Sequence, residues 1–145
     1  MLKKQRTIKK EISYSGVGLH TGNPSTIRFK PAAPNKGIRF KRTDLDKCPE
    51  ILADIDHVID ISRGTTIGQD DVVIHTVEHV LAAVAGLEID NILVELDSNE
   101  PPVGDGSALP YANILIDAGF EEQNYPKDYL VIEKTVSYTD EKRGI

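Results

Sequence analysis

The segment 76–86 constrains the fold of this chain most, because its composition predicts a helix that is covered on most sides. Its large apolar side chains recur three and four residues apart, as on one helical face: Val77, Val80, Leu81 and Val84. The positions around them include three alanines, where a surface helix would carry lysine and glutamate. Thr76 is a suitable N-cap and Gly86 a suitable C′ residue. We therefore expect other parts of the chain to pack around this helix.

Several short runs before residue 76 arrange their apolar side chains as strands do. The predicted strands are residues 7–12, 26–30, 37–41, 65–68 and 72–74. Residues 26–30 and 37–41 both alternate apolar and basic side chains, and we expect them to pair antiparallel. Residues 16–22 contain three glycines and predict a loop.

The chain after residue 86 predicts one more strand and a second helix. Residues 91–96 are apolar enough to form a central strand. Ser107 can cap a helix that runs to Ala118, and Gly119 is expected to end it. The predicted buried stripe of this helix is Leu109, Ala112, Leu115 and Ile116. Together these elements indicate a mixed α and β fold.

The last part of the chain predicts a domain boundary. Residues 121–127 are polar, contain one proline and predict a linker. Residues 129–138 then predict a strong strand that has no partner inside the chain. We therefore expect residues 1–126 to form one domain, and residues 127–145 to be the first strand of a truncated second domain.

Composition and charge exclude several classes of function. The chain has 145 residues, with 17 lysines and arginines against 23 aspartates and glutamates, which gives a net charge of −6. This balance argues against a protein that coats nucleic acid. Cys48 is the only cysteine, so no internal disulfide can form and a reducing compartment is expected. The sequence shows no secretory signal and no apolar run of about 18–20 residues, so we expect a cytoplasmic protein.

The stretch from His75 to His79 carries the most specific chemical pattern. It matches the H-x-x-E-H motif of inverted zinc hydrolases, in which two histidines bind zinc and a carboxylate activates water. If Thr76 caps the helix, however, His75 precedes it and the two histidines do not share a helical face. The residues alone leave open a self-contained zinc hydrolase and a noncatalytic binding module. In a noncatalytic binding module, Glu78 would be a carboxylate stabilised by the positive end of the helix dipole, and His79 would be a hydrogen-bonded core histidine.

Several further segments occur in a recognisable order. They are Gln5-Arg6-Thr7, Gly16-Val17-Gly18-Leu19-His20-Thr21-Gly22, Arg42-Thr43-Asp44-Leu45, residues 76–87 with Ile89-Asp90-Asn91, Pro102-Val103-Gly104-Asp105-Gly106-Ser107-Ala108, and residues 115–119. Together they closely resemble the UDP-3-O-acyl-N-acetylglucosamine deacetylase family of lipid A biosynthesis. The likeness covers the whole chain and is far more specific than the histidine motif alone.

The resemblance implies an α+β fold, a two-layer sandwich of one mainly antiparallel sheet with two helices on one face. This unit would be half of a two-domain enzyme. The implied reaction is the zinc-dependent hydrolysis of the N-acetyl group of UDP-3-O-acyl-N-acetylglucosamine, which releases acetate. By the same resemblance His79 is a zinc ligand, and Glu78 is the general base that takes a proton from water.

The resemblance also implies substrate contacts from His20, Thr65 and Asp105. Thr65 lies where the family has an insert that lines the site. On the residues alone, His20 can equally be an exposed loop histidine, and Asp105 can serve to turn its loop. His75 is expected not to be a ligand, and His57 is expected to lie on the surface.

The implied zinc site is incomplete within these residues. A catalytic zinc has three protein ligands and a water molecule, and the family takes the other two from an H-K-x-x-D motif in its second domain. No histidine follows His79. We therefore expect the chain alone to be inactive, with its own C-terminal domain as partner and an acylated UDP-sugar as substrate. No nucleic acid and no integral membrane segment is expected, while the oligomeric state and a fused dehydratase domain are left open.

Overall fold

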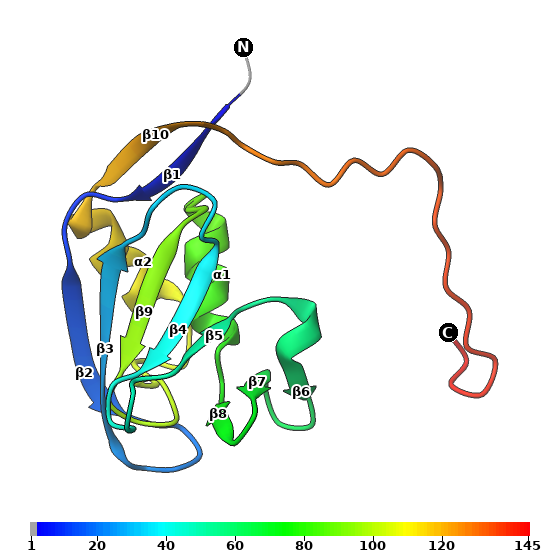
Figure 1. Ribbon diagram of the computed structural model, residues 1–145. Helices are drawn as coiled ribbons and strands as arrows, with labels where there is room; N and C mark the ends of the chain where they lie inside the picture. Colours follow the sequence, from blue (N-terminus) through cyan, green and yellow to red (C-terminus); the bar gives the residue numbers. More distant parts are fainter. Residues whose placement is uncertain (1–2) are drawn as a thin grey trace.

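Two helices lie on one face of a five-stranded sheet in the computed structural model, which describes residues 3–145 (Figure 1). The strands are β1 (Lys4–Ile8), β2 (Ile12–Val17), β3 (Pro24–Pro31), β4 (Ile38–Arg42), β5 (Glu50–Leu52), β6 (Val58–Asp60), β7 (Thr66–Gln69), β8 (Val72–Ile74), β9 (Ile92–Leu96) and β10 (Phe120–Pro126). The helices are α1 (Glu78–Gly86), α2 (Leu109–Ala118) and the short 3-10 helix η1 (Ile55–His57). The large sheet has the order β2-β3-β9-β4-β5, and only its β4–β9 pair is parallel. The predicted α+β sandwich with a mainly antiparallel sheet is confirmed.

Strand β9 lies at the centre of the large sheet, as its apolar sequence predicts. Three of its side chains point into the core and have no exposed surface: Ile92, Val94 and Leu96. The facing side chains of β3 and β4 are equally buried, including Phe29 and Phe40. A strand with neighbours on both edges satisfies its backbone groups on both sides, which suits a sequence this apolar.

The strands formed by residues 26–30 and 37–41 do not pair with each other, so that prediction is wrong. β9 lies between them, antiparallel to β3 and parallel to β4. Both β3 and β4 carry cations on the face away from the helices, and like charges directly opposite each other destabilise a sheet. β9 instead places Glu95 opposite Arg28 on one side and opposite Lys41 on the other.

Helix α1 packs its valine face against the sheet. Val77, Val80 and Val84 have no exposed surface, which confirms three members of the predicted stripe. The fourth, Leu81, is half-buried and packs against the core. Ala82 and Ala85 on the other side are exposed. The expectation that this helix is covered on most sides is therefore not met within residues 3–145, because the side with Ala82 and Ala85 is open.

Helix α1 begins later and ends later than predicted. Val77 is the N-cap residue without a side-chain cap bond, and Thr76 before it has a positive φ of 56°. The Thr76 hydroxyl donates to the carboxylate of Glu100 at 2.8 Å, and this bond replaces N-capping. Gly86 still belongs to the helix, and Leu87 is its C-cap. The predictions of Thr76 as N-cap and Gly86 as C′ residue are therefore wrong.

Helix α2 ends at Ala118 as predicted, but it begins at Leu109 with Ala108 as its N-cap residue, so the prediction of Ser107 as N-cap is wrong. Its C-cap residue is Gly119, whose φ is 70°. Its buried face also differs from the predicted one. Its buried side chains are Tyr111, Leu115 and Ala118. Leu109 and Ile116 are 59% and 53% exposed, so these two members of the predicted stripe are wrong. Tyr111 accounts for this change of buried face, because its ring enters the core and its hydroxyl donates to the backbone carbonyl of Pro102. Burial raises the pKa of Tyr111, so this hydroxyl keeps its proton.

The predicted linker at residues 121–127 is wrong, because most of it forms β10. This strand pairs antiparallel with β1 in a two-stranded ribbon at the end of the large sheet. Its polar side chains form hydrogen bonds to other parts of the chain, which a polar composition alone does not predict. The amide of Gln123 donates to the carbonyl of Ala32 at 2.8 Å and accepts from the amide of Asn91 at 2.7 Å.

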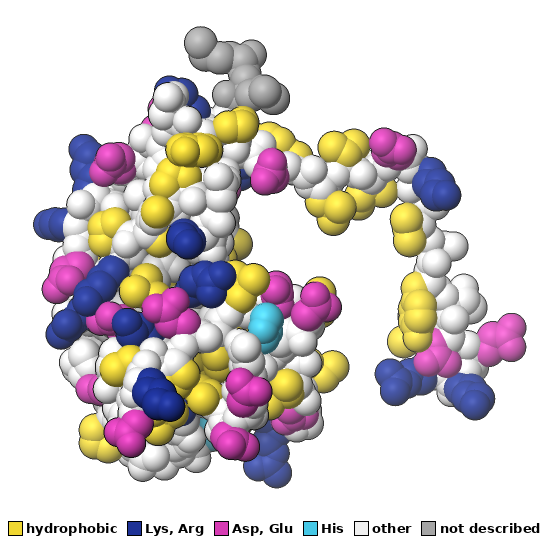
Figure 2. Space-filling model, viewed as in Figure 1, with side chains coloured by type: hydrophobic (Ala, Val, Ile, Leu, Met, Phe, Trp, Pro, Cys, Tyr) yellow, Lys and Arg dark blue, Asp and Glu magenta, His cyan; other side chains and the backbone are white. Residues whose placement is uncertain are grey.

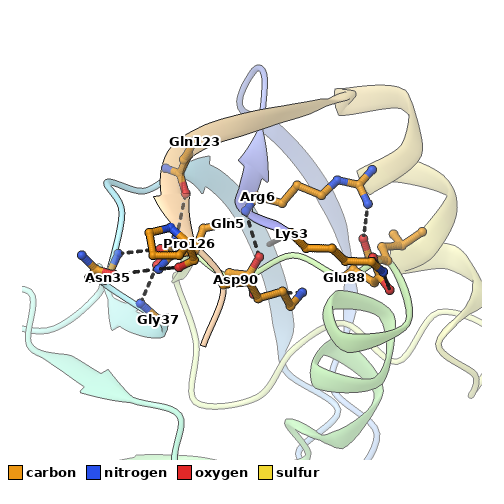
Figure 3. A network of polar contacts seen from close by, with 12 residues as sticks. Lys3, Gln5, Arg6, Asn35, Gly37, Glu88, Asp90, Gln123 and Pro126 are labelled. Carbon is orange, nitrogen blue, oxygen red and sulfur yellow. Dashed lines mark hydrogen bonds and ion pairs between the residues drawn. The ribbon is translucent and has the colours of Figure 1, made fainter. Parts of the chain in front are cut away.

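A network of side-chain amides fastens this ribbon to the sheet (Figure 3). Asn91 is 1% exposed and uses both ends of its amide. Its Oδ1 accepts from the backbone N–H groups of Lys36 and Gly37 at 2.9 Å each. Its Nδ2 donates to Gln5 at 2.8 Å and to Gln123 at 2.7 Å. The start of β9 is thus tied to both strands of the ribbon.

Residues 127–145 run away from the two layers as an extended arm without helix or strand (Figure 1). The prediction of a strand at residues 129–138 is wrong for this chain, because no neighbouring strand accepts its backbone hydrogen bonds. Leu130 is 95% exposed and Val136 is 78% exposed, and Figure 2 shows hydrophobic side chains along the arm. The proposed division into residues 1–126 and 127–145 stays a prediction.

A second, three-stranded sheet of β6, β7 and β8 lies beside the start of α1 (Figure 1). The β7–β8 pair confirms the two short strands predicted there. Arg42 links the two sheets, because it donates to the carbonyl of Val73 at 2.9 Å and makes two bonds to Asp44. The Arg42 guanidinium holds the pKa of Asp44 below its usual value. Over residues 3–145 no helix has the length and apolar character required to cross a membrane.

Candidate active site at the start of helix α1

Glu78 is the first residue of α1, and its side chain is held by the segment just before β7. Its Oε2 accepts a 2.8 Å hydrogen bond from the backbone N–H of Thr65. The backbone N–H of Val77 in turn donates to the Thr65 carbonyl at 3.1 Å. A Cβ atom at Gly64 would lie 2.9 Å from Oε1, so the close approach of the carboxylate requires glycine there.

His79 lies beside this carboxylate. Its Nε2 is 4.0 Å from Oε1 of Glu78, and the two side chains are 32% and 36% exposed. An imidazole with open surface can offer a ring nitrogen to a ligand that approaches from outside. The structure therefore presents an accessible carboxylate and an accessible imidazole side by side on one helical turn.

A cleft of about 210 Å³ adjoins this pair. It is lined by His20, Thr21, Asp60, Ser62, Arg63, Gly64, Thr66, His75 and Thr76. These residues come from the glycine loop after β2, from the end of β6 through the start of β7, and from the chain that enters α1. Because Gly64 lines the cleft and contacts Glu78, the carboxylate lies at its edge.

Four of the predicted site residues thus belong to one neighbourhood. Glu78 and His79 are adjacent, Thr65 bonds directly to Glu78, and His20 lines the cleft. Asp105 is used differently: its Oδ1 accepts from the backbone N–H and the hydroxyl of Ser107, at 2.9 and 2.7 Å. The Ser107 hydroxyl holds the pKa of Asp105 below its usual value. This geometry matches the reading in which Asp105 turns its loop.

His75 lines the cleft but does not share a helical face with His79. It precedes α1 by three residues, and the positive φ of Thr76 redirects the chain between them. Its Nδ1 is 3.2 Å from the hydroxyl of Thr66. The i, i+4 geometry that the H-x-x-E-H motif needs is therefore not formed here.

Within residues 3–145 no three side chains of histidine, cysteine, aspartate or glutamate converge to hold a metal ion. The start of α1 offers one imidazole together with one carboxylate. This pair can supply one nitrogen ligand and one base to a metal site, and the remaining ligands must come from other residues.

The residue that sequence reasoning missed is Glu100, which has no exposed surface. Its carboxylate accepts hydrogen bonds from the backbone of His20, from the backbone and hydroxyl of Thr21, and from the hydroxyl of Thr76. Burial raises the pKa of Glu100, but the bonds from Thr21, Thr76 and His20 outweigh burial and hold it below its usual value. A glutamate in a loop before two prolines is normally exposed, and only these distant donors reveal its role.

Comparison with known proteins identifies the family of the chain. The family model described as LpxC: UDP-3-O-acyl N-acetylglycosamine deacetylase matches residues 5–145. A bifunctional enzyme LpxC/FabZ from Chlorobaculum tepidum is 55% identical over 145 residues, which is 100% of this chain and 31% of that protein. A UDP-3-O-acyl-N-acetylglucosamine deacetylase from Myxococcus xanthus is 50% identical over 136 residues, which is 94% of this chain and 43% of that protein. One of the same name from Coxiella burnetii is 42% identical over 142 residues, covering 98% of this chain and 47% of that protein.

The chain therefore spans between about a third and a half of the length of these curated relatives. The family match covers both layers of the fold, the cleft and the Glu78–His79 pair. On this match, this chain belongs to the LpxC family of UDP-3-O-acyl N-acetylglycosamine deacetylases.

Proposed function

We propose that the full-length protein hydrolyses the N-acetyl group of UDP-3-O-acyl-N-acetylglucosamine and releases acetate, as a step of lipid A biosynthesis. The observation that carries this proposal is the Glu78–His79 pair, fixed at the edge of a cleft in a chain of the deacetylase family. A deacetylase needs a base for water and a group that polarises the amide, and this pair supplies the base and part of the second requirement.

The residues present fit one part of a zinc site. His79 would supply one nitrogen ligand, because its imidazole is partly exposed and lies beside a carboxylate. A bound zinc ion polarises the amide carbonyl and lowers the pKa of water. The other protein ligands would come from the C-terminal domain, which agrees with relatives about twice as long as this chain or longer.

Glu78 would act as the general base. Its carboxylate accepts a proton from water while the water oxygen bonds to the acetyl carbonyl carbon. The bond from that carbon to the sugar nitrogen would then break as the nitrogen takes up the proton that Glu78 had received, and acetate would leave. The Thr65 N–H would keep the carboxylate beside the cleft through this sequence, because its 2.8 Å bond holds Oε2 and leaves Oε1 for the water.

His20 and Thr65 would contact or border the sugar nucleotide. His20 lines the cleft from the loop after β2, and Thr65 lies in the segment that faces it. Asp105 would act at a distance from the substrate by shaping the loop before α2, because its carboxylate is engaged by Ser107. The residues 127–145 would pair within the C-terminal domain, which gives their exposed apolar side chains a partner.

The proposal is tested on the purified full-length protein with UDP-3-O-acyl-N-acetylglucosamine, by mass spectrometry of the deacetylated sugar and by metal analysis. We expect one zinc per protein and turnover of the substrate. His79→Ala should lose both the zinc and the turnover. His57→Ala is the matched control, because His57 binds Asp54 at 2.6 Å and does not line the cleft. Zinc binding and turnover that survive His79→Ala would refute the assignment.

A further inference from the structure

Glu100 is a buried carboxylate that the proposed reaction does not use. It has no exposed surface, and over the described residues it forms no ion pair with lysine, arginine or histidine. Its negative charge is balanced by neutral donors, since two hydroxyls and two backbone N–H groups point at its oxygens. Removing a charged group from water is costly, so the ionised carboxylate is stable here only while these donors stay in place, and the donors are held in turn by the carboxylate.

The donors come from two walls of the cleft. Thr21 donates through its backbone N–H and its hydroxyl, both at 2.9 Å, from the loop that carries His20. Thr76 donates through its hydroxyl at 2.8 Å from the segment that enters α1. Thr21 and Thr76 both line the cleft. Glu100 itself lies beneath them, so it joins the two walls without touching the space between them.

The loop after β2 is shaped around this carboxylate. A Cβ atom at Gly18 would lie 2.4 Å from Oε2 of Glu100 and 2.4 Å from the hydroxyl oxygen of Thr21. Any residue other than glycine would therefore displace the carboxylate or the threonine. Gly18 is therefore a glycine for a physical reason, because only a residue without a side chain lets the loop approach the Glu100 carboxylate this closely.

The entrance to α1 is strained at the point where Glu100 holds it. Thr76 is β-branched and has a φ of 56°, a region that such residues rarely adopt. A conformation of this kind persists only when the surroundings fix it. The bond to Glu100 is the side-chain contact that fixes Thr76. Two residues later the chain reaches Glu78, so the direction in which Thr76 leaves the turn sets where the Glu78–His79 pair points.

We propose that Glu100 is a positioning residue for the deacetylation site, which it serves by holding the Thr76 turn so that Glu78 enters α1 beside Thr65 at the edge of the cleft. This inference rests on the proposed function. Glu100 does not touch the substrate, and it acts through Thr76 on one wall and Thr21 on the other.

The test compares Thr76→Val, Thr76→Ser and Ser25→Ala in the full-length protein. Thr76→Val keeps the branched shape and removes the hydroxyl, while Thr76→Ser keeps the hydroxyl. Ser25→Ala is the matched control, because Ser25 bonds to the backbone carbonyl of Glu100 at 2.6 Å and not to its carboxylate. All three are assayed for kcat, KM, zinc content and melting temperature.

We expect Thr76→Val to lower kcat by about tenfold to a hundredfold, the usual effect of a misplaced catalytic group. Its KM should stay within about twofold of the wild type and its zinc content should be unchanged, since the substrate contacts and His79 remain. Thr76→Ser should keep a kcat near the wild type. Ser25→Ala should lower the melting temperature and leave kcat and KM unchanged. The inference is overturned if Thr76→Val and Ser25→Ala both destabilise the protein and both keep wild-type kcat.

A second readout separates this inference from the proposed function. Hydrogen exchange at the backbone amides of Val77 and Glu78 reports the start of α1 without any substrate. We expect faster exchange there in Thr76→Val than in Ser25→Ala. If the wild-type protein shows no deacetylation, the proposed function fails, and this exchange comparison still decides whether Glu100 holds the entrance to α1. Equal exchange in the two variants would contradict the inference.

Discussion

The carboxylate of Glu78 accepts a 2.8 Å hydrogen bond from the backbone N–H of Thr65. The donor belongs to the segment just before β7, and the acceptor is the first residue of α1. The bond therefore joins the small sheet to the helix at the edge of the cleft. It holds one carboxylate oxygen and leaves the other beside His79, whose Nε2 is 4.0 Å away.

This division of the two oxygens predicts the behaviour of Glu78→Gln in the full-length protein. Glutamine keeps the size of the side chain and an oxygen for the Thr65 bond, but it cannot take a proton from water. We expect kcat to fall by about 10²–10⁴-fold, the usual contribution of a general base. Zinc content should stay at the wild-type level, because Glu78 is not the ligand. Metal analysis beside steady-state kinetics checks both, and loss of zinc in this variant would make Glu78 a ligand instead of a base.

Gly64→Ala tests the same geometry from the other side. The added Cβ would lie 2.9 Å from Oε1 of Glu78, so the carboxylate must move away from its present place. We expect kcat to fall by about tenfold or more, since small displacements of a catalytic group are costly. The control is Gly86→Ala at the end of α1, where a Cβ would meet nothing within 4 Å. That change should raise helix stability by about 0.5–1 kcal/mol and keep kcat. Equal kcat values in the two variants would speak against the role of Gly64.

Much of this fold could be predicted because the signal was local. The valine stripe of α1 and the apolar run of β9 each follow from spacing within one segment. The pairing of β3 with β4 was predicted wrongly, because alternation shows which face of a strand is buried and not which strand lies beside it. Glu95, some 50 residues further on, decides that question by placing a carboxylate between two cationic strands.

The site residues also differ in whether the sequence signal for them is local. Glu78 and His79 are neighbours in sequence, so a short motif was enough to find them. Glu100 has partners at residues 20, 21 and 76, and nothing near it in the sequence distinguishes it from an exposed loop glutamate. Its bond to Thr76 also explains why Thr76 does not cap α1 as predicted.

Asn91→Ala should destabilise the protein strongly. Asn91 is 1% exposed and its Oδ1 accepts from the backbone N–H groups of Lys36 and Gly37. Alanine leaves both donors without this partner, at about 1–3 kcal/mol for each donor that stays buried. Urea unfolding followed by circular dichroism measures the loss. Asn23→Ala, in an exposed loop, is the control and should stay within about 0.5 kcal/mol of the wild type. A loss at position 91 as small as that of the control would show that the amide network is dispensable.

Glu100 makes the stability of the protein depend on acid. Its pKa is held below its usual value in the folded chain, because the bonds from Thr21, Thr76 and His20 outweigh the effect of burial. The stability gained from its ionised form is therefore fully present above the pKa of an unfolded glutamate, about 4.3, and is lost as the pH falls from there through the folded pKa. Glu100→Gln removes the titrating group, so it should be less stable than the wild type at pH 7 and should lose less stability between pH 5 and pH 3. Urea midpoints of both proteins across this range, with Glu11→Gln as an exposed control, test the sign. Parallel curves for the wild type and Glu100→Gln would show that this carboxyl does not titrate with the folding equilibrium.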